Sequence, residues 1–120
     1  MIFLSIIIPA YNSEKTIVPL LSSIAASGKV NFGEIEIIIV DDRSKDKTVD
    51  ELLRYVSKYF VSLCHCKIVL LKKNSGPAYA RNIGVKYAKG KVVLFLDADV
   101  VLYKNTLFEV INSFKNDPDL

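Results

Sequence analysis

Four short runs of apolar residues, rich in valine and isoleucine, constrain the fold of this chain more than any other feature. The runs are FLSIIIP (3–9), EIEIIIV (34–40), KIVLLK (67–72) and KVVLFL (91–96). β-Branched and apolar residues in runs of this length predict strands. Because the apolar character is nearly continuous within each run, we expect both faces of every strand to be covered, as in parallel sheets.

The segments between the predicted strands have the periodicity of amphipathic helices. Apolar residues recur at helical spacing within 17–25, 49–60, 77–88 and 107–114. The chain therefore alternates strand and helix, which predicts an α/β fold with an open, mainly parallel, twisted sheet and helices on both faces. The length of 120 residues, of which 51% are hydrophobic, suits one such domain.

Single residues predict where these helices begin and end. Pro19 predicts that the first helix starts near this residue, where a missing N–H costs little. Asp46 is placed to cap the second helix, and Gly90 to close the third as a C-terminal glycine. The fourth helix is expected to start at Asn105 or Thr106.

Charge and hydropathy exclude several classes of protein. The net charge of +3 is mild, and no basic cluster is interleaved with aromatic residues, so we expect no nucleic-acid partner. The N-terminal segment MIFLSIIIPAYN is too short to span a bilayer and lacks the basic region of a signal peptide. We therefore expect a domain that faces the cytoplasm, and a longer parent protein could still associate with a membrane.

The segment Cys64-His65-Cys66 places three candidate metal ligands side by side. On a strand, however, the imidazole of His65 points away from the face that carries both thiols, and a disulfide between cysteines this close would be strained. The segment therefore predicts two buried thiols of a reduced protein and no metal site.

Polar residues follow all four predicted strands. They are PAYN (9–12), DDRS (41–44), NSGP (74–77) and DAD (97–99). Because the carboxyl ends of parallel strands share one edge, where ligands of open α/β sheets bind, we expect four aspartates to converge there.

Converged carboxylates repel one another. Two charges about 4 Å apart interact by roughly 4 kcal/mol in an effective dielectric of about 20. A divalent cation relieves this repulsion, and oxygen ligands suit Mg²⁺ or Mn²⁺, which also bind substrate phosphates. The alternative is that each aspartate caps a helix or shapes a turn.

In combination, four motifs resemble those of family-2 glycosyltransferases with the GT-A fold. They are PAYN, VDD-x-S-x-D-x-T, G-P-x-x-A-R-N-x-G and D-A-D, and they follow one another in order with family-like spacing over essentially all 120 residues. The resemblance implies that residues 1–120 are the nucleotide-sugar-binding half of a GT-A catalytic domain, without the half that binds the acceptor.

The resemblance also implies roles for the D-A-D segment and for the residues after the first strand. Asp99 would coordinate the divalent cation, and Asp97, next to Ala98, would contact the ribose or the donor sugar. Pro9, Ala10 and Tyr11 would line the pocket for base and ribose. A half-buried core tyrosine is the alternative for Tyr11.

Asp42 would accept a hydrogen bond from the base, and here the chemistry of the carboxylate agrees with the resemblance. An ionised carboxylate only accepts hydrogen bonds, so it suits the ring N–H of uracil, thymine or guanine. The expected donor is thus a UDP-, dTDP- or GDP-sugar. Arg81 would approach the diphosphate or pair with Asp41 or Asp42. Asp41, Gly76 and Ala98 are counted with the donor-binding residues, although Gly76 with Pro77 could simply start the third helix.

The implied reaction moves a sugar from a nucleotide diphosphate to an acceptor hydroxyl. The cation would stabilise charge on the leaving phosphate, and a general base must take the proton of the hydroxyl. In inverting members of the family this base lies in the second half of the domain, so we expect it beyond Leu120. The isolated chain should then bind donor weakly and transfer sugar poorly or not at all.

The same truncation predicts an uncovered sheet edge and apolar surface, hence a tendency to self-associate. A longer protein could use a membrane or lipid-linked acceptor. Two other functions remain open from the residues alone: a sugar nucleotidyltransferase, although its glycine-rich basic loop is replaced by PAYNSEK, and a non-catalytic module that binds a nucleotide sugar or a protein. Dinucleotide-binding and P-loop motifs are absent.

Overall fold

Four parallel strands form the single sheet of this computed structural model, which describes residues 1–120. The strands are β1 (Leu4–Ala10), β2 (Ile35–Asp41), β3 (His65–Leu70) and β4 (Val92–Phe95), in the order β3-β2-β1-β4. Each pairs with its neighbours in parallel, and Leu4 stands opposite both Ile35 of β2 and Val92 of β4. The predicted open parallel α/β sheet is confirmed.

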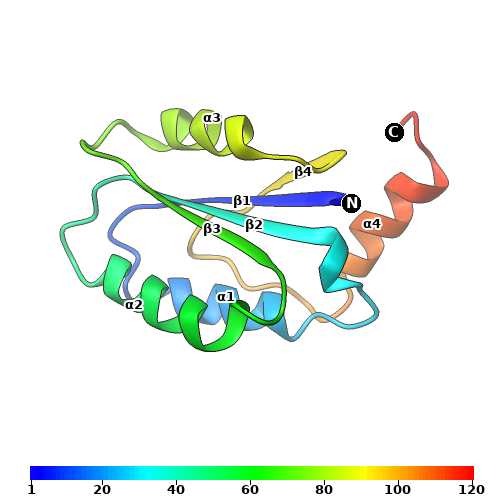
Figure 1. Cartoon of the computed structure of the whole chain (residues 1–120), viewed down its shortest axis with the longest axis horizontal. Helices are drawn as coiled ribbons and strands as arrows, with labels where there is room; N and C mark the ends of the chain where they lie inside the picture. The colour runs from blue at the N-terminus through cyan, green and yellow to red at the C-terminus, as the bar shows by residue number, and fades with distance from the viewer.

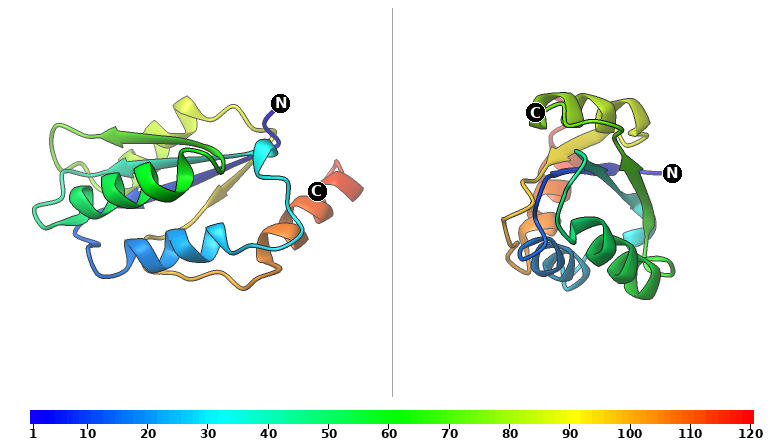
Figure 2. Two further views of the ribbon diagram at one scale, coloured as in Figure 1. Left: turned by 60° about the horizontal axis from the view of Figure 1, so that its bottom comes forward. Right: turned by 90° about the vertical axis from the view of Figure 1, so that its left-hand side faces the viewer.

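Helices cover both faces of this sheet (Figures 1 and 2). Helix α3 (Pro77–Tyr87) lies across β1 and β2 on one face, whereas α1 (Ile17–Ala25) and α2 (Thr48–Tyr55) lie side by side on the other. Helix α4 (Thr106–Asn116) lies near the end of the sheet where β1 begins. A 3₁₀ turn (Phe32–Glu34) precedes β2. No helix is both long and apolar enough to cross a membrane.

The two central strands carry the core, and the two edge strands do not. Every residue of β2 and all but one of β1 are buried, because α3 packs on one side of them and α1 and α2 on the other. β3 and β4 alternate between partly buried and exposed residues. The expectation that all four strands are covered on both faces is therefore wrong for β3 and β4, whose outer edges stay open. Exposed apolar side chains on these edges include Leu70, Val93 and Phe95.

Helix boundaries differ from the predictions in ways that hydrogen bonding explains. Helix α1 begins at Ile17, so Pro19 is its third residue, where a backbone N–H has no partner within the helix. Lys47, not Asp46, is the residue before α2, yet the carboxylate of Asp46 still accepts from the N–H of Thr48 at 2.9 Å. Helix α4 begins at Thr106 after Asn105, as expected.

Gly90 does not end α3 in a left-handed conformation. Instead it allows the backbone after α3 to approach β1: a Cβ at this position would lie 2.6 Å from Ser5 Oγ and 2.8 Å from Ser5 N. The N–H of Gly90 donates to Ser5 Oγ at 2.8 Å, and Ser5 Oγ donates to Glu36 Oε2 at 2.6 Å. Since the N–H of Lys89 donates to the same Glu36 oxygen, these bonds tie the end of α3 to β1 and β2.

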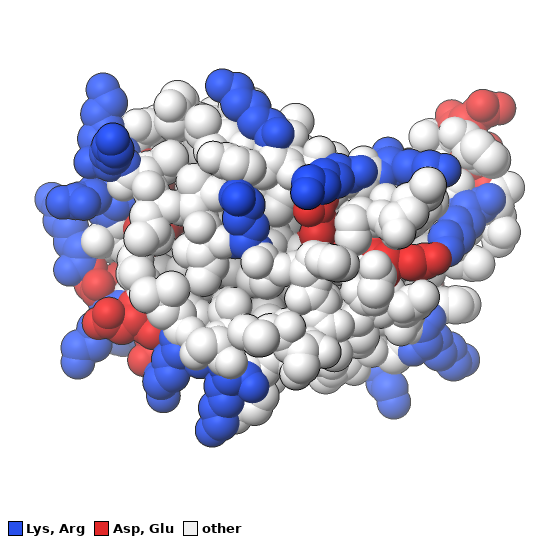
Figure 3. Space-filling model, in the orientation of Figure 1, with Lys and Arg blue, Asp and Glu red and all other residues white.

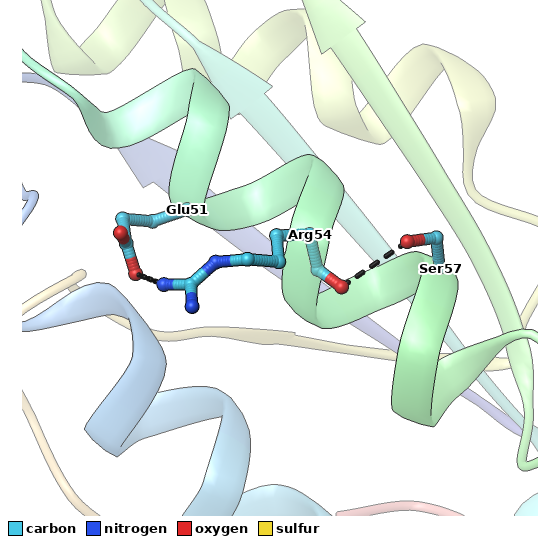
Figure 4. Close-up of polar contacts among 3 residues, drawn as sticks. All are labelled: Glu51, Arg54 and Ser57. Carbon is cyan, nitrogen blue, oxygen red and sulfur yellow. Dashed lines mark hydrogen bonds and ion pairs between the residues drawn. The ribbon is translucent and has the colours of Figure 1, made fainter.

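Helix α2 continues into a wider π-helical turn, Val56–Phe60 (Figure 4). At the start of the turn, the hydroxyl of Ser57 donates to the carbonyl oxygen of Arg54 at 3.1 Å, and the guanidinium of Arg54 pairs with Glu51. The Arg54 side chain is 71% exposed, so this pair contributes little to stability.

Cys64 and Cys66 are free thiols, and both are only partly buried, whereas His65 is exposed. The expectation of fully buried thiols is corrected because both cysteines lie at or next to the edge strand β3. Burial still raises the pKa of Cys64 to about 11 and, together with the nearby Cys64, that of Cys66 to about 12. Both thiols therefore stay protonated at neutral pH and are unreactive.

Candidate functional site

The two aspartates that follow one another at the end of β2 point to opposite faces of the sheet. The carboxylate of Asp42, 3% exposed, accepts hydrogen bonds from the backbone N–H groups of Ser75 (2.7 Å) and Gly76 (2.9 Å), just before α3. The carboxylate of Asp41, 2% exposed, accepts instead from the N–H and the hydroxyl of Ser44. The alternation of side chains along a strand explains this division.

Gly76 takes a backbone conformation that turns its N–H toward Asp42. Its φ is 94° and its ψ is 161°, a combination that is essentially confined to glycine. A Cβ at this position would meet no atom within 4 Å, so conformation rather than space requires glycine here. Asp42 and Gly76 together fix the start of α3 against the end of β2.

A pocket of about 290 Å³ opens beside Asp42. We name it the Asp42 pocket, and it lies between the carboxyl ends of β1 and β2 and the segment that leads into α3. It brings together five residues that the sequence assigned to the donor nucleotide. Its lining consists of Pro9, Ala10, Tyr11, Asp42, Asn74, Gly76 and Pro77.

Asn74 is a pocket residue that the sequence did not single out. Its side-chain Nδ2 donates to the carbonyl oxygen of Asp42 at 3.1 Å. Its position shortly after the third apolar run was the available signal, because residues at the carboxyl ends of parallel strands are the ones that reach a ligand. Its amide adds both a donor and an acceptor to the pocket wall.

Exposed basic residues surround this end of the sheet (Figure 3). Lys and Arg side chains gather at the left-hand end of the view, where Figure 1 places the carboxyl ends of the strands. Positive charge near a pocket attracts anionic ligands and speeds their association. The exposed basic residues of the two loops beside the Asp42 pocket are Arg43, Lys45, Lys47, Lys72 and Lys73.

Two loops, one after β1 and one after β2, are joined at Asp46 and Thr48. Thr48 Oγ1 donates to Asp46 at 2.5 Å and accepts from the N–H of Ser13 at 2.7 Å, and the N–H of Glu14 donates to Asp46 at 3.3 Å. Burial raises the pKa of the Asp46 carboxyl, but the hydrogen bonds from Thr48 and Glu14 outweigh it and lower that pKa below its ordinary value. Asp46 is thus a residue that orders the loops.

Arg81 pairs with Asp97, not with either aspartate of β2. Its guanidinium lies 3.3 Å from Asp97 Oδ1, and both side chains are substantially exposed, at 37% and 67%. The expected partners, Asp41 and Asp42, are already occupied by backbone and hydroxyl donors. Gly76, the residue before α3, binds Asp42 after β2, and Arg81 of α3 binds Asp97 after β4. The tips of β2 and β4 therefore lie at the same end of the sheet.

The prediction that four aspartates converge is wrong. β1 stands between β2 and β4, which separates their tips by about 10 Å of strand spacing, and Asp41 points to the other face. Asp97 and Asp99 are exposed, and Ala98 between them is buried at 8% exposure. No group of three or more His, Cys, Asp or Glu side chains is arranged to hold a metal ion.

Known proteins share both the sequence and the fold of this chain. A family model described as Glycosyl transferase family 2 matches residues 5–120. The poly(ribitol-phosphate) beta-N-acetylglucosaminyltransferase TarS of Staphylococcus aureus is 44% identical over 106 residues, and the minor teichoic acid biosynthesis protein GgaB of Bacillus subtilis is 35% identical over 119 residues. These matches cover 86% and 97% of this chain, but only 17% of TarS and 13% of GgaB.

The crystal structure of residues 1–349 of S. aureus TarS in complex with UDP-GlcNAc superposes with a TM-score of 0.84 and 35% identity, covering 96% of this chain and 32% of that one. The GT-A fold predicted by resemblance is therefore confirmed. Since the family model spans nearly the whole sequence, this chain belongs to glycosyl transferase family 2.

Proposed function

We propose that this chain binds the nucleotide of a nucleotide-diphosphate sugar in the Asp42 pocket and forms the donor side of a glycosyltransferase. The observation that carries the proposal is the co-location of Pro9, Ala10, Tyr11, Asp42 and Gly76 in one pocket at the carboxyl end of a parallel sheet. The similarity to TarS, a structure of which contains UDP-GlcNAc, supports a uridine nucleotide.

Asp42 and Asn74 suit the hydrogen-bonding edge of uracil. Each Asp42 oxygen accepts one backbone N–H and keeps a further lone pair, which can accept the ring N–H of the base. Asn74 has a second amide hydrogen, which can reach a base carbonyl oxygen. Cytosine presents an acceptor nitrogen where uracil has its N–H, so two acceptors would face each other and binding would be weakened.

The proposed reaction breaks the bond between the sugar C1 and the phosphate oxygen and forms a bond from C1 to an acceptor hydroxyl oxygen, whose proton passes to a general base. Arg81 lies where it can exchange Asp97 for a phosphate oxygen of the donor, since its ion pair is exposed. The exposed carboxylate of Asp99 would hold a divalent cation, Mn²⁺ or Mg²⁺, that retains most of its waters. When bound, such a cation would stabilise negative charge on the departing diphosphate.

Titration calorimetry with uridine and UDP, each with and without Mn²⁺, tests the proposal. We expect UDP to bind about tenfold more tightly with Mn²⁺, because only the diphosphate reaches the cation, whereas uridine should bind equally well in both conditions. Asp99→Asn should remove the Mn²⁺ dependence and leave uridine binding intact. Asp119→Asn, another exposed aspartate, serves as the matched control and should behave like the wild type.

Two results would count against the proposal. If neither UDP nor uridine gives a heat of binding in any condition, a nucleotide site is excluded and a module that binds only protein is favoured. Equal binding of UDP and CDP would show that the base is not read by Asp42 and Asn74.

A further inference from the structure

The loop that carries Tyr11 is held by its neighbour Asn12. Tyr11 lines the Asp42 pocket but is 43% exposed, so packing alone does not fix its position. Asn12 has a φ of 47°, in the left-handed region that asparagine tolerates better than most other non-glycine residues. This backbone turn after β1 allows both the N–H and the side chain of Asn12 to reach the loop after β2.

Asn12 makes two hydrogen bonds to the loop after β2, one from its backbone and one from its side chain. Its N–H donates to Ser44 Oγ at 2.9 Å, and its Oδ1 accepts from the N–H of Lys45 at 2.8 Å. We call this pair of bonds the Asn12 clasp. The clasp joins residues 32 and 33 positions apart in the chain, so it fixes the loop after β1 against the loop after β2.

Asp41 sets the direction of the Ser44 hydroxyl in this clasp. Ser44 Oγ donates its only hydrogen to Asp41 Oδ1 at 2.6 Å, and the N–H of Ser44 donates to Asp41 Oδ2 at 3.0 Å. The lone pairs of Ser44 Oγ are therefore left for the N–H of Asn12. Asp41 is a buried carboxylate that does not line the Asp42 pocket, and orienting Ser44 gives it a structural role.

We propose that Asn12 and Ser44 are positioning residues that hold Tyr11 in the place where it packs against the nucleotide. The inference rests on the proposed function, since it concerns the same pocket. Neither residue lines the Asp42 pocket, so each acts on the ligand only through Tyr11. Preorganising a binding loop improves affinity because less freedom is lost when the ligand binds.

Affinity for UDP in single and double variants tests this inference. Asn12→Gly keeps the left-handed backbone accessible and removes only the side-chain bond, so the chain should fold normally and bind UDP about fivefold more weakly. Ser44→Ala should have an effect at least as large, and Ser44→Thr, which keeps the hydroxyl, should restore most of the affinity. In a Tyr11→Ala background, Asn12→Gly should change UDP affinity less than twofold, because the residue through which it acts is gone.

Ser57→Ala is the matched control, since it removes a serine hydroxyl in the π-helical turn after α2, which is bonded to the carbonyl oxygen of Arg54 and does not line the Asp42 pocket. It should leave UDP affinity unchanged. The inference is overturned if Asn12→Gly and Ser44→Ala bind UDP like the wild type, or if they weaken binding equally with and without Tyr11. A wild-type chain that binds no UDP would instead overturn the proposed function, so the two failures are distinguishable.

Discussion

Asp42→Asn will weaken UDP binding by about 100-fold or more and lower the free energy of unfolding by about 2 kcal/mol, although the two side chains have the same shape. The carboxylate accepts one backbone N–H on each oxygen, from Ser75 at 2.7 Å and from Gly76 at 2.9 Å. An amide has one accepting oxygen, so its nitrogen must face one of these N–H groups. A buried donor is then left without an acceptor, which costs about 1–3 kcal/mol.

Binding suffers for a further reason. The asparagine can turn its oxygen toward the backbone or toward the base, but not toward both, and the start of α3 moves once Gly76 is released. Calorimetry with UDP and urea denaturation measure the two effects separately. A stable Asp42→Asn chain with wild-type UDP affinity would show that Asp42 has no part in the site.

Glu36→Gln is the control for replacing a buried carboxylate by an amide. Glu36 lies near the start of β2, at the opposite end of the strand from Asp42, and is 8% exposed. Ser5 Oγ and the N–H of Lys89 both donate to its Oε2, so one amide oxygen can accept both bonds. We expect UDP affinity to be unchanged in this variant.

Gly90→Ala will lower the free energy of unfolding by about 3 kcal/mol, because the added methyl group meets the backbone of β1. The new Cβ would lie 2.8 Å from Ser5 N and 3.0 Å from the carbonyl carbon of Leu4, both backbone atoms of a buried central strand. These atoms cannot move without disturbing β1. The clash would also separate Gly90 from Ser5, and Ser5 in turn supports the buried carboxylate of Glu36.

Urea denaturation of Gly90→Ala, with Gly28→Ala as the control, measures this effect. The nearest atoms to a Cβ at Gly28 belong to the flexible side chain of Lys104, the closest at 3.1 Å, so that variant should lose less than about 1 kcal/mol. Equal stability of the two variants would show that the approach of Gly90 to β1 is not a constraint on the fold.

The strands, the helices and the end of the sheet that carries the pocket could all be predicted from apolar periodicity. That signal is strong because each element buries a long face, as in β2, where all seven residues are buried. The same signal could not show that β3 and β4 are edge strands, because strand order depends on contacts between elements far apart in the sequence. The exposure of β3 and β4 therefore differed from the expectation.

The roles of the aspartates were harder to predict, because they depend on the conformation of the loops. The alternation of side chains could have separated Asp41 from Asp42, but their partners, Ser44 on one side and Ser75 with Gly76 on the other, lie in irregular segments. The pairing of Arg81 with Asp97 likewise follows from the placement of α3 across β1. A sequence motif therefore predicts that such residues lie near the site, but it does not distinguish the residues that bind a ligand from those that hold a loop.

Binding of the nucleotide in the Asp42 pocket is tested most directly by backbone ¹H–¹⁵N chemical shifts recorded during a UDP titration. We expect the largest changes at Tyr11, Asp42, Ser75 and Gly76. A second pocket, lined in part by Cys66, Lys67 and Lys89, lies toward the starts of β2 and β3. Changes confined to that pocket, with the amide shifts of Ser75 and Gly76 unchanged, would contradict binding in the Asp42 pocket.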